Sequence, residues 1–319
     1  MPPLSRLQHN VPLLRGLLPL AMPLFVALAL TGQPAVADEL RPIRAVGIEN
    51  QYADVIRQVG GPQVAVSAIE SNPNTDPHEF QASPKIARMV AQADVVVLNG
   101  LGYDDWADKI LAASATPGRH VINVQALLKL PDDTPNPHLW YDPATMPAVA
   151  HAVAEAFAAR DPAHAKAYRA NAATFDASLD GWRKAIAAFR AAHPGVAVAV
   201  TEPVADYLLE ALGAKVATPK ALEMAAMNDT DPAPQDIAAQ EALFSGHKVA
   251  AFLYNQQVTD DLTRRFLTLA RKNGIPVVGV YETMPQPGFT YQSWMEAETA
   301  AIENAVSRGL STETLEAGR

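Results

Sequence analysis

The chain has 319 residues, of which 49% are hydrophobic and 18% are charged. These proportions predict a globular protein of two domains or one large domain, and they exclude a disordered chain. Acidic residues outnumber basic ones 34 to 25, giving a net charge of −9, which argues against a nucleic-acid-binding protein. Because cysteine is absent, disulfide scaffolds, thiolate metal sites and a lipid-modified N-terminal cysteine are not expected.

The N-terminal segment has the pattern of a signal peptide. Arg6 and Arg15 supply a positive start, residues 16–30 form a short apolar core, and residues 35–37 offer the small side chains that a signal peptidase recognises. A membrane anchor is the alternative, but this apolar core contains prolines and is shorter than the ~20 residues needed to span a bilayer. We therefore expect cleavage near Ala37 and secretion from the cytoplasm.

Runs of Val, Ala and Ile then alternate with helical patterns, which predicts an α/β fold with parallel sheets. The runs lack alternation of polar and apolar residues, as expected of strands covered by helices on both faces. The predicted strands are 44–48, 64–69, 94–98 and 120–124 in the first half, and 196–200, 215–217, 248–253 and 276–280 in the second.

An apolar stripe lies between the two halves. Tyr168, Phe175, Trp182 and Phe189 recur every seven residues, which predicts one helix over 163–192, about 45 Å long. The aromatic side chains are interpreted as facing the core, with a ligand-binding role as the alternative. We expect two lobes, each a small parallel sheet with flanking helices, joined by one long rigid helix, with a cleft between them.

The expected domain limits follow from this division. They are 1–37 for the signal peptide, 38–160 for the N-terminal lobe, 161–193 for the connecting helix and 194–319 for the C-terminal lobe.

Two histidines occur in settings that favour metal binding. His78 and His138 each follow a proline in a loop after a first-lobe strand, so each imidazole is presented from a stiff segment. A single Pro-His pair is weak evidence, but two in matching contexts indicate a paired site. Apart from His9 in the signal peptide, the other histidines are interpreted as structural or solvated; they are His120, His151, His164, His193 and His247.

Two glutamates follow second-lobe strands at matching positions. Glu202 comes two residues after the strand predicted at 196–200, and Glu282 comes two residues after 276–280. Taken singly, each is interpreted as a surface acid. However, the carboxyl ends of parallel strands line the ligand crevice, so both carboxylates are expected there. Together with two neutral imidazoles they compensate the charge of a divalent cation.

Further motifs accompany these residues along the mature chain. They are the segments 76–80, 93–94, 99–103, 136–140, 201–203, 206–207 and 212–213, with Glu282 and Tyr291. In order and spacing they resemble the cluster A-I solute-binding proteins of ABC transporters, which capture manganese, zinc or, in some members, iron. The resemblance implies that His78, His138, Glu202 and Glu282 are the metal ligands. Glutamate at the third position is similar to manganese binders, whereas the fourth position usually carries aspartate.

The resemblance implies a periplasmic protein of an ABC importer that holds one divalent metal ion between its lobes and delivers it to a permease in the inner membrane. Mn²⁺ is favoured, Zn²⁺ is close behind and Fe²⁺ is possible. We expect a monomer without enzymatic activity, nucleic acid or lipid anchor. The alternatives are a secreted metal-dependent hydrolase and a metal-binding adhesin-like surface protein. The sequence has no HExxH, GxSxG or phosphate-loop motif that would favour the hydrolase.

Overall fold

The computed structural model describes residues 41–72, 80–285 and 287–317. The predicted signal peptide lies outside these residues. Among the helices described, none is both long enough and apolar enough to cross a membrane.

The first lobe is built on a parallel sheet with the strand order β2-β1-β3-β4. Alternate strand residues face opposite sides, so Val95 and Val97 pack with α1 and α5 while Val96 and Leu98 pack with α2 and α3. The strands are β1 (Ile43–Glu49), β2 (Val64–Glu70), β3 (Val95–Leu98) and β4 (His120–Asn123). The helices are α1 (Asn50–Gly60), α2 (Pro84–Gln92), α3 (Asp105–Ala113), α4 (Val124–Leu128) and α5 (Thr145–Arg160).

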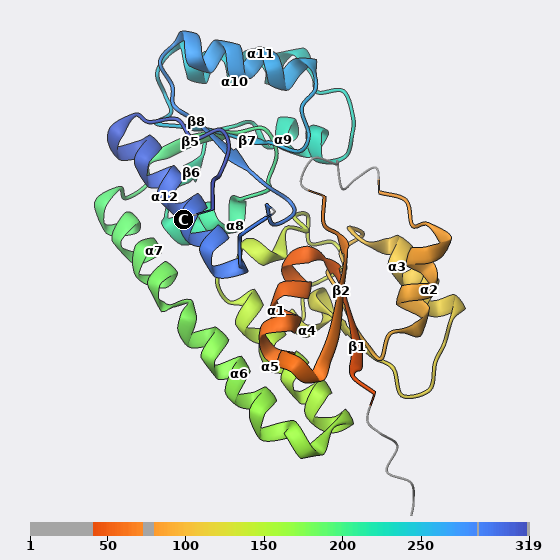
Figure 1. Ribbon diagram of the computed structural model, residues 1–319. Coiled ribbons are helices and arrows are strands. Elements are labelled where there is room, and N and C mark those ends of the chain that lie inside the picture. The colour runs from red at the N-terminus through yellow and green to blue at the C-terminus, as the bar shows by residue number, and fades with distance from the viewer. Residues whose placement is uncertain (1–40, 73–79, 286, 318–319) are drawn as a thin grey trace, which may run out of the picture. The chain divides into compact units, whose positions relative to one another are not determined.

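The second lobe repeats this plan with the strand order β6-β5-β7-β8, again parallel. One face packs with α8 and α12, and the other with α9, α10 and α11 (Figure 1). The strands are β5 (Ala197–Val200), β6 (Lys215–Val216), β7 (Phe252–Asn255) and β8 (Val277–Val280). The helices are α8 (Asp206–Leu212), α9 (Lys220–Met227), α10 (Pro234–Ser245), α11 (Asp261–Lys272) and α12 (Tyr291–Arg308).

The predicted fold class is confirmed, and each predicted strand overlaps an observed one. The largest difference concerns β7, which begins four residues after its predicted start and ends two residues beyond its predicted end. Tyr254 and Asn255 continue the pairing with β8, opposite Gly279 and Val280. This extension brings the Asn255 side chain to the carboxyl edge of the sheet.

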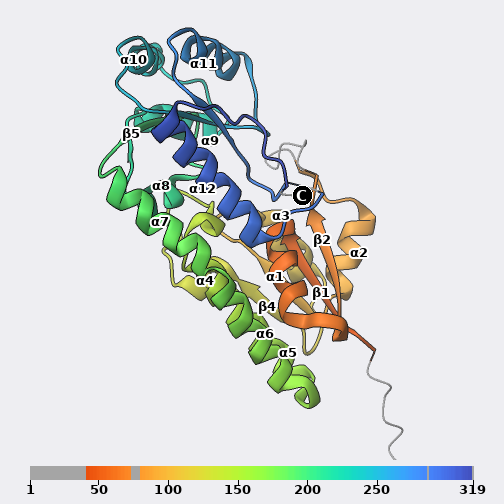
Figure 2. The ribbon, with the colours of Figure 1, turned by 60° about the vertical axis from the view of Figure 1, so that its left-hand side comes forward.

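The connection between the lobes is helical but interrupted. α6 (Ala165–Ser178) and α7 (Asp180–Ala192) follow one another along the green ribbon of Figures 1 and 2, with Leu179 between them. The Leu179 N–H donates to the carbonyl of Asp176, one residue short of its α-helical partner. The hydroxyl of Ser178 takes the carbonyl of Phe175 instead, at 2.6 Å.

The predicted apolar stripe is buried along both helices and belongs to one continuous core with residues of the two lobes. Tyr168, Phe175, Trp182 and Phe189 are each at most 2% exposed. This confirms the core-facing interpretation of the aromatic residues. The core fixes the frame on which the loops after the strands are held.

Candidate metal centre

His138 lies directly before a short 3-10 helix (Leu139–Tyr141) and is fully buried. The side-chain oxygen of Asn136 lies 3.0 Å from its backbone nitrogen and 2.7 Å from its Nδ1. The amide nitrogen of Asn136 donates to the carbonyl of Pro203 at 2.8 Å, which fixes which end of the amide is the acceptor. Nδ1 therefore carries the proton, and the lone pair of the neutral ring is on Nε2.

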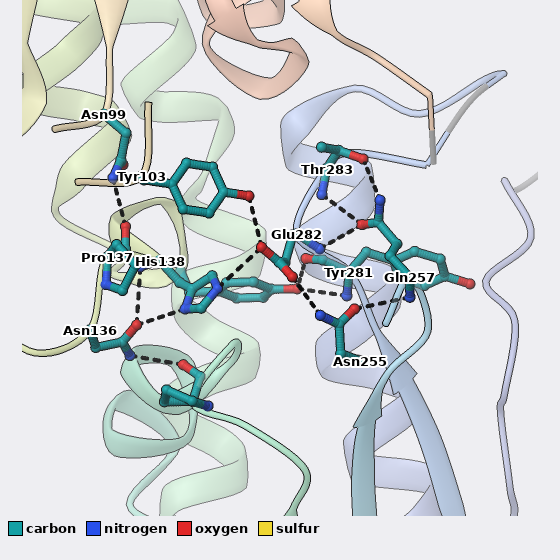
Figure 3. A network of polar contacts seen from close by, with 12 residues as sticks. Asn99, Tyr103, Asn136, Pro137, His138, Asn255, Gln257, Tyr281, Glu282 and Thr283 are labelled. Atoms are coloured by element: carbon teal, nitrogen blue, oxygen red, sulfur yellow. Dashed lines mark hydrogen bonds and ion pairs between the residues drawn. The ribbon is translucent and has the colours of Figure 1, made fainter. Parts of the chain in front are cut away.

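Glu282 follows β8 and is also fully buried. Its Oε2 lies 3.5 Å from Nε2 of His138 and accepts a hydrogen bond of 2.8 Å from the hydroxyl of Tyr103 (Figure 3). Its Oε1 accepts a hydrogen bond of 2.5 Å from the side-chain amide of Asn255. Its backbone N–H donates to Gln257 at 2.8 Å. The two carboxylate oxygens are thus oriented by the loop that carries Tyr103 and by the end of β7.

The facing atoms of His138 and Glu282 form an unusual buried pair. Nε2 has no hydrogen-bond partner among the residues that the structure describes. With Nδ1 already protonated, Nε2 and Oε2 present two lone pairs to each other in a space shielded from water. Such an arrangement is stabilised when a proton or a metal cation joins the two atoms.

The loop that carries Tyr103 has an uncommon backbone. Gly100, Leu101 and Gly102 have φ values of 82°, 56° and 79°, so three successive residues occupy the left-handed region. The Asp104 carboxylate stabilises the loop by accepting hydrogen bonds from the N–H groups of Asn99 and Gly100, at 2.6 and 2.9 Å.

Two further contacts hold this loop and its tyrosine at the site. Asn99 donates from its side chain to the carbonyl of Pro137 at 2.8 Å, which ties the loop to the one before His138 (Figure 3). Burial and the neighbouring Glu282 raise the pKa of Tyr103, so its hydroxyl keeps the proton that it donates.

A second group of acids lies at the carboxyl edge of the first sheet and was not predicted. Glu49 ends β1, pairs in register with Glu70 of β2, and is fully buried beside Asp104. Burial, and then the charges of Asp104 and Glu70, raise the pKa of Glu49, which favours its neutral form. Glu49 directly follows the strand predicted at 44–48, so its place at the end of a buried strand is a signal that the sequence contains.

The two remaining predicted ligands are Glu202 and His78. Glu202 follows β5, is 3% exposed, and lines a second-lobe cavity of about 280 Å³ together with Asp229 and Asp260. His78 lies outside the described residues. Within the described ranges, no three His, Asp or Glu side chains come close enough together to hold a metal ion. The structure therefore brings together His138 and Glu282, while Glu202 lies on the loop whose Pro203 carbonyl accepts a hydrogen bond from Asn136.

Hydrogen bonds join the loops of the two lobes around this centre. Asn50, the first residue of α1, donates to the carbonyl of Met284 at 2.7 Å and accepts from its N–H at 2.8 Å. Gln51 donates to the backbone carbonyl of Glu282 at 3.1 Å. The backbone from the Glu282 carbonyl to Met284 is thus anchored to the first lobe.

The model of the family described as "Zinc-uptake complex component A periplasmic" matches residues 49–305, and the chain belongs to this family. The manganese-binding lipoprotein MntA of Bacillus subtilis (strain 168) is 29% identical over 184 residues, which are 53% of this chain and 59% of that protein. The iron-binding protein YfeA of Yersinia pestis is 23% identical over 145 residues, which are 44% of this chain and 46% of that protein. The chain thus spans about half the length of these curated relatives.

Solved structures share the two-lobed fold. The SBP FpvC from Pseudomonas aeruginosa, in complex with Mn²⁺, has a TM-score of 0.66 at 23% identity, covering 84% of this chain and 98% of that one. At this level of identity the likeness shows the fold, and the roles of individual residues have to be argued from this chain.

Proposed function

We propose that this protein is the periplasmic substrate-binding component of an ABC importer, which captures one divalent transition metal ion and delivers it to a permease in the inner membrane. The observation that carries the proposal is the buried pair of His138 Nε2 and Glu282 Oε2, 3.5 Å apart. Each partner is held by its own hydrogen bonds, so both lone pairs are oriented before a cation arrives.

The proposed ligand set is His78, His138, Glu202 and Glu282. Two imidazoles and two carboxylates offer nitrogen and oxygen donors with a charge of −2, which a divalent cation balances. The carboxylates make the set richer in oxygen than a three-histidine site, and this supports Mn²⁺ as the favoured cargo over Zn²⁺ and Fe²⁺. Membership of the family and the metals named for its relatives support the same class of cargo.

The proposed cycle consists of binding, a limited movement of the lobes and release, with no covalent bond made or broken. We further propose that the chain is exported through its N-terminal segment, with cleavage near Ala37, and works as a monomer outside the cytoplasm.

The test is elemental analysis of the purified mature protein, followed by competitive titration with Mn²⁺ and Zn²⁺. We expect one metal ion per chain, and His138→Ala should weaken binding at least tenfold because it removes one donor. The matched control is His151→Ala, since His151 is an exposed histidine of α5. Absence of metal binding, or equal losses in the two variants, would refute the proposal. Metal-dependent hydrolysis of ester or peptide substrates would favour a hydrolase instead.

A further inference from the structure

The hydroxyl of Tyr141 lies at a junction between the two lobes. Tyr141 ends the 3-10 helix that follows His138, and its oxygen is 2.8 Å from the carbonyl oxygen of Tyr281, the residue before Glu282. The same oxygen lies 3.3 Å from the Tyr281 nitrogen and 2.7 Å from Oε1 of Glu298 in α12. One hydroxyl thus contacts the segments that carry both halves of the candidate metal centre.

The number of protons at this junction determines which of these contacts can be hydrogen bonds. A phenol has one proton to donate and can accept hydrogen bonds at its oxygen. If Tyr141 donates to the carbonyl of Tyr281, the contact with Glu298 is a hydrogen bond only when the carboxyl group is protonated and is itself the donor. If Glu298 is ionised, it attracts the phenol proton, and the Tyr281 carbonyl loses this partner.

The surroundings of Glu298 favour the neutral form. The side chain is fully buried, and burial raises its pKa to about 8, although hydrogen bonds with Tyr141 and Trp294 lower it in part. The titratable groups that interact with it are Tyr141 and Tyr281. Two of the other elements packed against α12 carry charged groups: Asp180, Arg183, Lys184 and Arg190 on α7, and Asp54 and Arg57 on α1. None of them is a cause of the raised pKa of Glu298, and β8 carries no charged group.

We propose that neutral Glu298 and Tyr141 are positioning residues of the metal centre: Glu298 donates to Tyr141, Tyr141 donates to the carbonyl of Tyr281, and this chain holds Glu282 opposite His138. The inference rests on the proposed function, because it assigns these residues a role in metal affinity. When Glu298 loses its proton to solvent at alkaline pH, the Tyr141 hydroxyl turns toward the carboxylate and the Glu282 segment loosens.

The first experiment tests the protonation of Glu298 without any metal. Between the usual carboxyl pKa of 4.5 and about 8, the folded protein holds a proton at Glu298 that the unfolded chain lacks. Stability of the wild type should therefore fall across this window relative to Glu298→Gln, which has no proton to lose. We expect the Tm advantage of the variant to grow from pH 5 to pH 8 and then level off. A constant Tm difference from pH 5 to pH 8 would overturn the neutral-acid assignment.

The second experiment measures Zn²⁺ affinity by competition with a chelator at pH 7 and pH 9. Tyr141→Phe keeps the ring but removes the relay, and binding should weaken about tenfold at pH 7. Glu298→Gln can still donate to Tyr141 but has no proton to lose, so its Zn²⁺ affinity should fall less than that of the wild type between pH 7 and pH 9. The control is Tyr168→Phe. Tyr168 is a buried tyrosine of α6, and its hydroxyl donates at 2.8 Å to Asp161 in the turn that precedes this helix.

The outcomes separate the two proposals. A wild type that binds no metal refutes the proposed function, while the metal-free stability experiment still tests Glu298. A wild type that binds Zn²⁺ with Tyr141→Phe and Tyr168→Phe equally affected refutes the positioning role alone. The same loss between pH 7 and pH 9 in the wild type and in Glu298→Gln also refutes it.

Discussion

Asn136 offers a sharp test of how the imidazole of His138 is prepared for a metal ion. In Asn136→Ala, the His138 Nδ1 and N–H groups lose their acceptor and the carbonyl of Pro203 loses a donor. The ring proton is then free to move to Nε2, where Oε2 of Glu282 accepts it from 3.5 Å away. A metal ion would have to displace that proton before it could bind.

The expected magnitudes follow from these contacts. Loss of an outer partner of a metal-binding histidine typically lowers affinity 10- to 100-fold, or about 1.4 to 2.7 kcal/mol. Each lost hydrogen bond is worth about 0.5–1.5 kcal/mol of folding stability, so the three contacts of the Asn136 side chain together predict a loss of about 1.5–4.5 kcal/mol. Metal affinity and stability should therefore both decrease.

The assay is chelator competition for Mn²⁺ and Zn²⁺ at pH 7.5, combined with urea unfolding of the metal-free protein. Asn171→Ala is the control, because the Asn171 side chain of α6 donates at 2.9 Å to the carbonyl of Val59 in α1 of the first lobe. It should lose stability but retain its metal affinity. If both variants bind metal as tightly as the wild type, Asn136 does not orient the imidazole and the tautomer argument is wrong.

Two further predictions concern selectivity and pH. Glu202→His replaces an oxygen donor with a nitrogen donor, so Mn²⁺ binding should weaken at least tenfold in a competitive titration, while Zn²⁺ binding falls much less or improves. Equal losses for the two metals would remove the argument for manganese. Asp94 is buried, which raises its pKa, but hydrogen bonds from Arg41 and Arg44 outweigh burial and lower it. The Asp94 carboxylate therefore stabilises the fold above the pKa that it has in the unfolded chain, and this stabilisation is lost on acidification. In urea unfolding, Asp94→Asn should cost about 1–2 kcal/mol at pH 7 and progressively less below about pH 4. A difference in stability that does not change with pH would contradict this linkage.

The fold was predictable because its signals are local. Strands covered by helices on both faces are continuous apolar runs, and the stripe from Tyr168 to Phe189 has the period of a helix. The interruption at Leu179 was not predictable in the same way. It depends on which donor takes the carbonyl of Phe175, and the Ser178 hydroxyl competes with the backbone for it.

The site was predictable to the extent that it depends on strand ends. This rule led to Glu282, which the structure brings to His138, and to Glu202. It did not lead to Tyr103 or Asn255, because neither residue type is an obvious metal ligand. Their role depends on a left-handed loop and on a two-residue extension of β7, which are set by tertiary packing. The assignment of His78, His138, Glu202 and Glu282 as metal ligands stays a prediction.

The lobes are also held together more closely than a connecting helix alone would require. Buried side chains of the first lobe make hydrogen bonds to the backbone beside both proposed second-lobe ligands: two from Asn50, and one each from Gln51, Asn136 and Tyr141. At about 0.5–1.5 kcal/mol for each of these bonds, separating the lobes along this surface would cost about 2.5–7.5 kcal/mol before any apolar area is exposed. The same bonds that orient Glu282 therefore oppose wide opening. Metal release by a small rearrangement is consistent with this cost, because it can leave most of these bonds intact.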